Sequence, residues 1–553
     1  MPGGGQLPLV AYGNQNAYIN GNPEITNFYK VFKRYTHFSQ EPISIPMDGP
    51  NELAMDTPIR IRAKIPRHAD LMTDLYFLFR VPEMFSKLFV NEQTQNTCIP
   101  AFRRIHALGA LMIDNVAIFV GGSKIQEFPG EWLAARATID YPSEKYARWR
   151  ELVGDVPELN EPEWGVYGKS PNYPYQKGEY PNVVAEVPSI PTPAMAPSTP
   201  ERTIRVPLPF WFTEGTGTAL PLIALQYHDV EVQITMRTMR EMYRIMDIDT
   251  NREPVRCGRR LDIAVDSSMI PVIPTSYNPA DPTSYDNLTL QSDYISDAGC
   301  NLTIKNFYTD VGQTVPTLEG YNLEPRLEGN YVYLTGKEQV VFAGRELQHI
   351  VHQVQTFRFP SVTARTKLDL DAHNVMHRLV FYGRRSDAIE SRNDYINLSN
   401  WKNKGQSPYW PLSAGAVVPN SGRFVPYTQF DILRSARLVI AGNEVFEEKE
   451  AKYFEVQAPF TSTEGDGCNG GSRRYRPDEV MGPIYQLPFA LHASDHQQPS
   501  GTLNASMLRE IQLEVNPWTL DPGSNYTYDF TVFVESLNLV KFQSGMGGLA
   551  YAV

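Results

Sequence analysis

Cysteine is scarce in this sequence: four occur among 553 residues, at positions 98, 257, 300 and 468. Thiols so few and so far apart form neither a disulfide framework nor a C-x-x-C motif. No run of about 18 apolar residues is present to span a bilayer, and the first residues lack the charged and apolar regions of a secretory signal. We therefore expect reduced cysteines and no transmembrane segment.

Clustered positive charge is missing as well. The chain has 50 Lys and Arg residues against 62 Asp and Glu residues, a formal net charge of −12, and no run of like charges. Binding to a phosphate backbone relies on clustered cationic side chains. The composition therefore predicts no direct contact with nucleic acid.

Proline and alternating hydrophobicity are abundant. Proline accounts for 44 of the 553 residues, about 8%, whereas the usual level is about 5%. This excess argues against a helical bundle, because proline breaks helices. Apolar and polar residues alternate strictly in residues 59–65, 230–236 and 511–516, as in half-buried antiparallel strands, and apolar residues line one face of a strand at 526–534. Turn dipeptides between apolar runs, Gly121-Gly122 and Gly442-Asn443, indicate hairpins. These patterns predict a mainly β protein.

Helical patterns are few. One helix is predicted to begin near Asn22 and Pro23, a capping residue followed by proline at the first helical position. Phe28, Phe32 and Tyr35 would then lie on one face together with Val31. A second helix is predicted over about 142–153.

An internal duplication gives the strongest signal of domain organisation. Three anchor segments occur twice in the same order: 71–77 and 375–381, 116–127 and 436–447, and 208–232 and 487–513. The spacing from Gly122 to Pro209 is 87 residues, whereas that from Gly442 to Pro488 is 46, so the first copy has about 41 extra residues. The proline-rich stretch 170–209 lies there and is typical of an extended surface loop.

Motifs for catalysis or metal binding are weak. His373 and His377 have the spacing of a zinc-protease helix, but Asn374 stands where the general-base Glu is needed, and the segment matches a strand anchor. His349 and His352 precede a predicted strand and have no cysteine nearby. No G-x-S-x-G elbow or P-loop occurs. We therefore predict no catalytic residue, no cofactor and no metal site.

Several ordered segments resemble one family, the double jelly-roll major capsid proteins of nucleocytoplasmic large DNA viruses. The segments that carry the resemblance are LVAYGNQNAYINGNPEITNF at 9–28, ALPLIALQYHDV at 219–230, YVYL at 331–334, HQVQ at 352–355, EAKYF at 450–454, QPSGTLN at 498–504 and SGMGGLAY at 544–551. They run from residue 9 to residue 551 and so cover the whole chain.

The resemblance implies two tandem eight-stranded antiparallel jelly rolls with long loops and a few short helices. The limits expected from it are an N-terminal arm at 1–26, a first jelly roll at 27–337, a linker at 338–347, and a second jelly roll with a C-terminal tail at 348–553. Two long insertions, at about 153–205 and 241–328, would form the exposed tower of a capsomer.

The implied function is that of a structural, non-enzymatic capsid protein. Three copies would close into a pseudo-hexagonal capsomer, and capsomers would tile an icosahedral virion shell after assembly in the host cytoplasm. The implied partners are the chain itself, neighbouring capsomers, and minor capsid and vertex proteins. The resemblance is also compatible with an internal membrane beneath the shell. Candidate assembly residues lie in the arm, just after it and in the tail: Tyr12, Asn16, Asn22, Pro23, Phe28, Gly545 and Gly547.

A second interpretation is a carbohydrate-binding or glycan-cleaving β-sandwich protein, because jelly rolls also host lectin and hydrolase sites. It predicts a monomer or dimer with an aromatic cleft and, for a hydrolase, two facing carboxylates about 5–10 Å apart. The seven tryptophans are scattered through the chain and give it little support.

Overall fold

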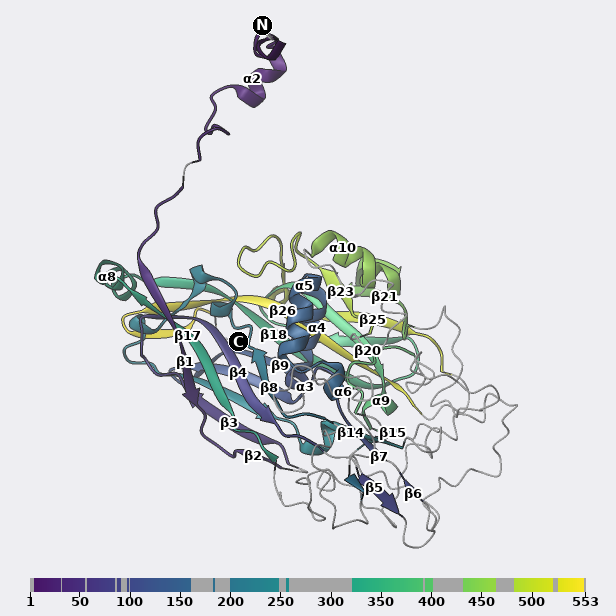
Figure 1. Cartoon of the computed structure of the whole chain (residues 1–553). Helices are drawn as coiled ribbons and strands as arrows, with labels where there is room; N and C mark the ends of the chain where they lie inside the picture. Colours follow the sequence, from purple (N-terminus) through teal and green to yellow (C-terminus); the bar gives the residue numbers. More distant parts are fainter. Residues whose placement is uncertain are drawn as a thin grey trace.

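The computed structural model contains two antiparallel β-sandwiches that lie side by side, with an N-terminal segment that extends away from them (Figure 1). The structure describes residues 4–30, 32–54, 57–84, 87–90, 97–98, 100–160, 183–184, 199–247, 255–257, 321–390, 393–400, 431–463, 482–520 and 526–551. Most of the two predicted tower insertions falls outside the described residues.

The first sandwich has two main sheets. In spatial order, one consists of β1 (Phe38–Pro46), β17 (Arg326–Leu334), β4 (Leu71–Val81) and β11 (Arg202–Pro207), with β12 (Leu220–Pro221) also paired to β4. The other consists of β3 (Ile59–Lys64), β13 (Val230–Met236), β8 (Ile113–Val120) and β9 (Ser123–Pro129).

The second sandwich repeats this arrangement. Its first sheet consists of β18 (Leu347–Val362), β26 (Tyr528–Gln543), β20 (Val375–Arg385) and β23 (Tyr485–Pro488), with β24 (Leu503–Asn504) paired to β20 and β27 (Met546–Leu549) paired to β26. Its second sheet consists of β19 (Thr366–Leu370), β25 (Ile511–Pro517), β21 (Leu433–Ile440) and β22 (Asn443–Glu450).

The two sandwiches share one topology. If the eight main strands of each are numbered along the chain, both have the sheet orders 1-8-3-6 and 2-7-4-5, which is the jelly-roll arrangement. Each duplicated sequence anchor occupies equivalent strands: β4 and β20, the β8–β9 and β21–β22 hairpins, and β13 and β25. The predicted fold class, two tandem jelly rolls, is confirmed.

Alternation in the sequence has the expected cause. Strand β3 buries every second side chain, and β13 does so beside it, with Ile61 opposite Ile234. The β8–β9 turn has Gly121 and Gly122 at φ of 58° and 82°, a backbone region that favours glycine and matches the twist of a hairpin. The second predicted hairpin, between β21 and β22, is also present, but its turn residues are Ala441 and Gly442, with φ of 50° and 78°, because Asn443 already pairs with Ile440.

Shorter strands form three small sheets: β2 (Glu52–Leu53) with β16 (Tyr321–Asn322); β7 (Pro100–Arg104), β14 (Tyr243–Asp247) and β15 (Val255–Cys257); and β5 (Lys87–Val90), β6 (Thr97–Cys98) and β10 (Val183–Val184). The α-helices are α1 (Leu7–Val10), α2 (Asn14–Asn20), α3 (Leu108–Leu111), α4 (Gly130–Asp140), α5 (Ser143–Leu152), α6 (Pro157–Asn160), α8 (Gly336–Gly344), α9 (Ser386–Glu390) and α10 (Ala458–Ser462). Single helical turns are η1 (Gly4–Gln6), η3 (Trp211–Thr213), η4 (Thr216–Thr218), η5 (Leu222–Ala224), η6 (Met239–Glu241), η10 (Tyr453–Gln457) and η12 (Ala505–Met507).

The two predicted helices have opposite outcomes. The helix predicted over about 142–153 is confirmed as α5. The helix predicted from Asn22 is wrong: residues 24–30 and 32–37 contain no helix, and Asn22 has a φ of 51°. Phe28 and Tyr35 are exposed there, so their apolar face packs against nothing in the described chain, and packing supplies most of a helix's stability.

Two hydrophobic cores account for most of the buried side chains. One fills the second sandwich. The other fills the first sandwich and continues onto the outer face of the β18–β26–β20 sheet, where it includes Val351, Val380, Phe533 and Phe542. The sheet is therefore buried on both faces, and the two sandwiches share a continuous apolar contact.

Candidate functional site

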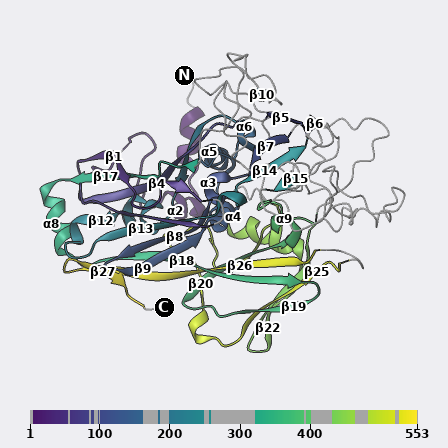
Figure 2. The same cartoon turned by 90° about the horizontal axis from the view of Figure 1, so that it is seen from below.

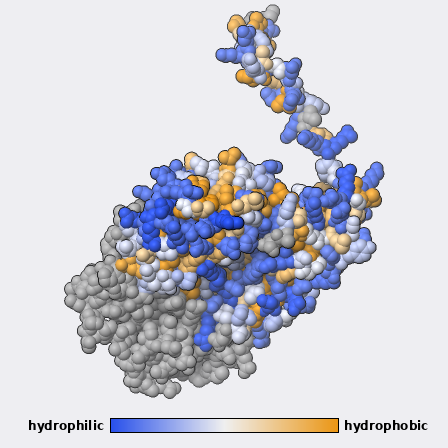
Figure 3. All heavy atoms as spheres, turned by 180° about the vertical axis from the view of Figure 1, so that it is seen from behind, coloured by the Kyte–Doolittle hydropathy of each residue, from blue (hydrophilic) through white to orange (hydrophobic). Residues whose placement is uncertain are grey.

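The N-terminal segment lies apart from the rest of the protein (Figure 1). Its apolar side chains are exposed: Leu7, Leu9, Val10, Tyr12, Tyr18, Ile19, Ile25, Phe28, Tyr29, Phe32 and Tyr35. Figure 3 shows hydrophobic residues distributed along this segment among hydrophilic ones. Five candidate assembly residues, Tyr12, Asn16, Asn22, Pro23 and Phe28, lie in it. So much uncovered apolar surface on an extended segment is typical of a surface that binds a partner.

The C-terminal tail folds back onto the same chain. Strands β26 and β27 form a hairpin whose turn contains Gly545 at a φ of 80°, and a side chain there would strike Tyr227. The Tyr227 N–H donates to the Gly545 carbonyl (2.9 Å), and the Gly547 N–H donates to His228 Nδ1 (3.2 Å). The tail of the second jelly roll is thereby attached to the first, whereas the N-terminal segment extends away from both (Figure 1), so the structure does not bring the candidate assembly residues together.

We define the seam as the contact between the two jelly rolls. From the first roll it contains α4 and β9, and from the second β18, β20 and β26, with β9 next to β18 (Figure 2). Nearly all of α4 is buried, including Trp132, whose Nε1–H donates to Glu535 of β26 (2.7 Å). The seam therefore combines apolar packing with buried charge.

Glu131 is the centre of one buried charge cluster in the seam. Its carboxylate accepts hydrogen bonds from Arg237 of the first roll (2.8 Å) and from the Tyr382 hydroxyl of the second, and Arg384 lies 3.5 Å away. Burial alone would raise the pKa of Glu131, but the guanidinium groups of Arg384, Arg237 and Arg358 hold this pKa well below its usual value. Glu131 is thus a buried carboxylate that attracts cations from both rolls.

Arg378 is the centre of a second cluster. The guanidinium donates two hydrogen bonds of 2.7 Å to the two carboxylate oxygens of Asp140, and it also donates to Glu535. Burial would raise the pKa of Glu535 and of Asp140, but Arg378 keeps both carboxyl groups ionised, with pKa values well below normal. Because Asp140 ends α4 and Arg378 lies in β20, this bidentate pair crosses the seam.

A β-bulge places the polar side chains of β20 in the seam. Met376 pairs with Ser536 and Arg378 pairs with Glu535, which leaves His377 as the extra residue. Met376 lies in the core of the second sandwich, whereas His377 and Arg378 both approach Glu535 on the other face. Bulges redirect side chains in this way and are frequent near functional sites.

The motif-based analysis missed this arrangement. The seam brings His352 and His377, one histidine from each dismissed pair, next to His496. Neither pair forms the cluster by itself, because the three histidines come from two different strands and a loop. The signal in the sequence was the duplication, because the strand order that it implies places β18 and β20 on either side of one central strand, β26. Strand order alone, however, does not predict the bulge in β20.

Among the described residues, no helix combines the length and apolar character needed to cross a membrane.

Comparisons with known proteins agree along the whole chain. Residues 26–296 match the family described as major capsid protein N-terminus, and residues 338–548 match the large eukaryotic DNA virus major capsid protein family. The chain is 26% identical to the major capsid protein of Phaeocystis pouchetii virus (99% of each chain covered) and 23% identical to that of Chrysochromulina ericina virus (100% of each). A chain of the PBCV-1 virus capsid has the same fold, with a TM-score of 0.60, 18% identity, and coverage of 96% of this chain and 100% of that one.

Proposed function

The chain belongs to the major capsid proteins of large eukaryotic DNA viruses, and we propose that three copies of it close into a pseudo-hexagonal capsomer. Membership gives it a structural, non-enzymatic role in the virion shell and sets aside the glycan-cleaving alternative. In the proposed capsomer, each subunit contributes two jelly rolls, so that a threefold ring presents six similar lobes to its neighbours.

The observation that carries this proposal is the pair of jelly rolls with one topology, joined through a buried seam. A tile with six lobes needs two lobes per subunit held at a fixed angle, and a seam with shared core and crossed ion pairs supplies that rigidity. A heterologous contact that closes after three copies gives cyclic symmetry. Interfaces inside an obligate trimer should bury roughly 2,000–5,000 Å² or more.

The remaining parts of the proposal concern partners and place. The exposed apolar residues of the arm would bind neighbouring capsomers or minor capsid proteins, and vertex proteins would close the shell. Candidate contacts are Tyr12, Asn16, Asn22 and Pro23 in the arm and Phe28 just after it, whereas Gly545 and Gly547 would act by fixing the tail. The limits 1–26, 27–337, 338–347 and 348–553 are proposed as the arm, first roll, linker and second roll. Assembly would take place in the host cytoplasm.

The native mass of the purified chain tests the trimer. We expect a species of three times the 62.6 kDa chain mass by light scattering on a sizing column, unchanged on tenfold dilution, because obligate interfaces do not dissociate at micromolar concentration. Hexagonal tiles should then be visible by electron microscopy of the same fraction. A folded species with the mass of one chain would contradict the proposal.

Removal of residues 1–20 tests the role of the arm. We expect trimers of normal thermal stability that no longer form ordered sheets or shells, since the arm makes no contact with the described body of the subunit and its apolar residues would be needed only between capsomers. The matched control is Val340→Ser, which removes another exposed apolar side chain outside the arm and should assemble normally. Normal shells from the truncated chain, counted by electron microscopy, would refute this role.

A further inference from the structure

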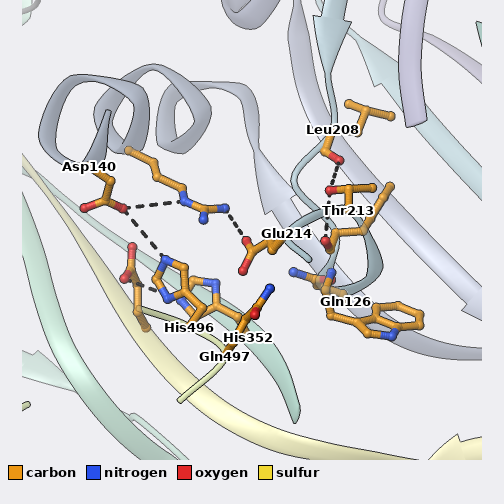
Figure 4. Close-up of polar contacts among 12 residues, drawn as sticks. Gln126, Asp140, Leu208, Thr213, Glu214, His352, His496 and Gln497 are labelled. Carbon is orange, nitrogen blue, oxygen red and sulfur yellow. Dashed lines mark hydrogen bonds and ion pairs between the residues drawn. The ribbon is translucent and has the colours of Figure 1, made fainter. Parts of the chain in front are cut away.

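Three buried histidines converge beside the seam. His352 comes from β18, His377 from the bulge in β20, and His496 from the segment between β23 and β24. Their exposed fractions are 1%, 3% and 7%, and one ring nitrogen from each lies within 4.8 Å of the others. Figure 4 shows His496 and His352 adjacent, with His496 directed toward Asp140. Histidines that meet from three separate segments form a compact, all-nitrogen cluster.

Hydrogen bonding does not account for these rings. Within the part of the chain that the structure describes, neither nitrogen of any of the three imidazoles has a hydrogen-bond partner. Buried polar atoms are nearly always satisfied, so six orphaned nitrogens in one place require an explanation such as a bound ion. An imidazole nitrogen without a proton has a free lone pair, which is the form that binds metals.

Glu535 provides a fourth donor. Its Oε2 lies 3.4 Å from Nε2 of His352 and 3.4 Å from Nε2 of His377. In a tetrahedral zinc site with bonds of about 2.0–2.1 Å, ligand atoms are about 3.3–3.4 Å apart, so these separations already match. The same carboxylate accepts hydrogen bonds from Trp132 and Arg378, which are the kind of outer contacts that orient a metal-binding carboxylate.

Charged groups of both signs surround the cluster. Three buried carboxylates, Asp140, Glu214 and Glu535, face the cluster against two guanidinium groups, Arg136 and Arg378. His496 Nε2 lies 3.8 Å from Asp140, and Arg136 bridges Asp140 and Glu214 (Figure 4). Burial raises the pKa of Glu214, whereas Asp140 and Glu535 are held ionised by Arg378, so these two carboxylates balance the two guanidinium groups.

We propose that His352, His377, His496 and Glu535 form a structural site for a divalent transition metal of the zinc class. Three imidazoles and one carboxylate suit Zn²⁺, and four protein ligands leave no position for a substrate, so the site is structural. A cavity of about 560 Å³, lined by His496, Asp140 and Arg136 among others, gives solvent access to one side of the cluster.

The metal would attach the 489–502 segment to the β18–β26–β20 sheet. This segment also contacts the first roll, because His496 faces Asp140 of α4 and Gln497 lies against Gly215. The ion would therefore hold a loop of the second roll in place across the seam. This role is independent of the proposed function, since it concerns the stability of one subunit.

The first test measures metal binding by the full-length chain. After removal of metals with a chelator and dialysis, titration with Zn²⁺ alone should give one site per chain by calorimetry, and Co²⁺ should produce the visible absorption of tetrahedral coordination. His496→Gln should weaken Zn²⁺ binding more than about 100-fold, because loss of even an outer contact costs about 10–100-fold. The matched control is His349→Gln, a buried histidine three residues before His352 that packs against Phe542 and should bind Zn²⁺ normally.

A second measurement separates binding from folding. Zn²⁺ should raise the melting temperature of the wild-type chain and of His349→Gln, but not of His496→Gln, because an ion stabilises only the state that binds it. If His496→Gln fails to fold, His377→Gln takes its place in the same titration. Absence of stoichiometric Zn²⁺ binding by the wild-type chain, or equal binding by folded wild-type and His496→Gln chains, would overturn the proposal. Neither result would affect the proposed trimer, which is tested separately by the native mass of the chain.

Discussion

Replacing Arg378 with methionine is expected to lower the free energy of unfolding by about 3–5 kcal/mol, the usual cost of removing one partner from a buried ion pair. The Arg378 side chain is fully buried and binds Asp140 of the first roll and Glu535 of the second. Methionine fills much of the same volume, but it removes the cation that Asp140 and Glu535 share and leaves Asp140 with the more distant Arg136 at 3.5 Å. Chemical denaturation of the purified protein, followed by tryptophan fluorescence, measures the loss.

The control for this variant is Arg62→Met. Arg62 is exposed and approaches Glu231 at 3.8 Å, and exposed ion pairs contribute about 0–1 kcal/mol. Its denaturation curve should overlap that of the wild-type chain. If Arg378→Met were as stable as Arg62→Met, the crossed ion pair would not hold the two rolls together, and the apolar contacts alone would do so.

Replacing Trp132 with alanine is the second large effect that we expect, again about 3–5 kcal/mol. The indole is fully buried in α4, packs against Phe128 and His352, and donates to Glu535. Alanine therefore creates a cavity and also removes a hydrogen bond to a buried carboxylate. Thermal and chemical denaturation should both report the destabilisation.

Phenylalanine at the same position separates these two contributions. Trp132→Phe keeps most of the apolar volume and loses one donor to Glu535, which still accepts from Arg378, so we expect about 1.5–3 kcal/mol, the contribution of a hydrogen bond to a charged group. Equal destabilisation by the alanine and phenylalanine variants would assign the whole effect to the hydrogen bond. A negligible effect of Trp132→Phe would assign it to packing.

The sequence predicted those parts of the fold in which one face of a strand meets water. Strands β3 and β13 alternate because their outer side chains are solvated, and the duplicated anchors located equivalent strands in both rolls. Strand β20 is buried almost throughout, so its alternation is lost and only the anchor revealed it. Helix α4 has no solvent-exposed face, because both rolls cover it, and its sequence consequently lacks the periodicity of a surface helix.

The histidine cluster was beyond prediction for a different reason. His377 reaches the seam because the bulge in β20 lets it and Arg378 approach Glu535 on one face, and a bulge is set by pairing with β26, about 160 residues later in the chain. The helix predicted from Asn22 was wrong for the opposite reason, because there the sequence pattern was present and the structure was not. The spacing of Phe28, Phe32 and Tyr35 is helical, but a spacing does not create the packing surface that a helix needs.

The pairing of first and last strands also determines when each roll can be completed during synthesis. Strand β1 pairs along its length with β17, Phe38 opposite Leu334, and β17 separates β1 from β4 in the sheet. At about 5–20 residues per second, a ribosome needs roughly 15–60 s to make the intervening chain. During that interval β1 and β4 have open edges toward the missing strand, and two nascent chains on one messenger could pair through them. The faster a cell produces this protein, the more it depends on protection of those edges until residue 334 has emerged.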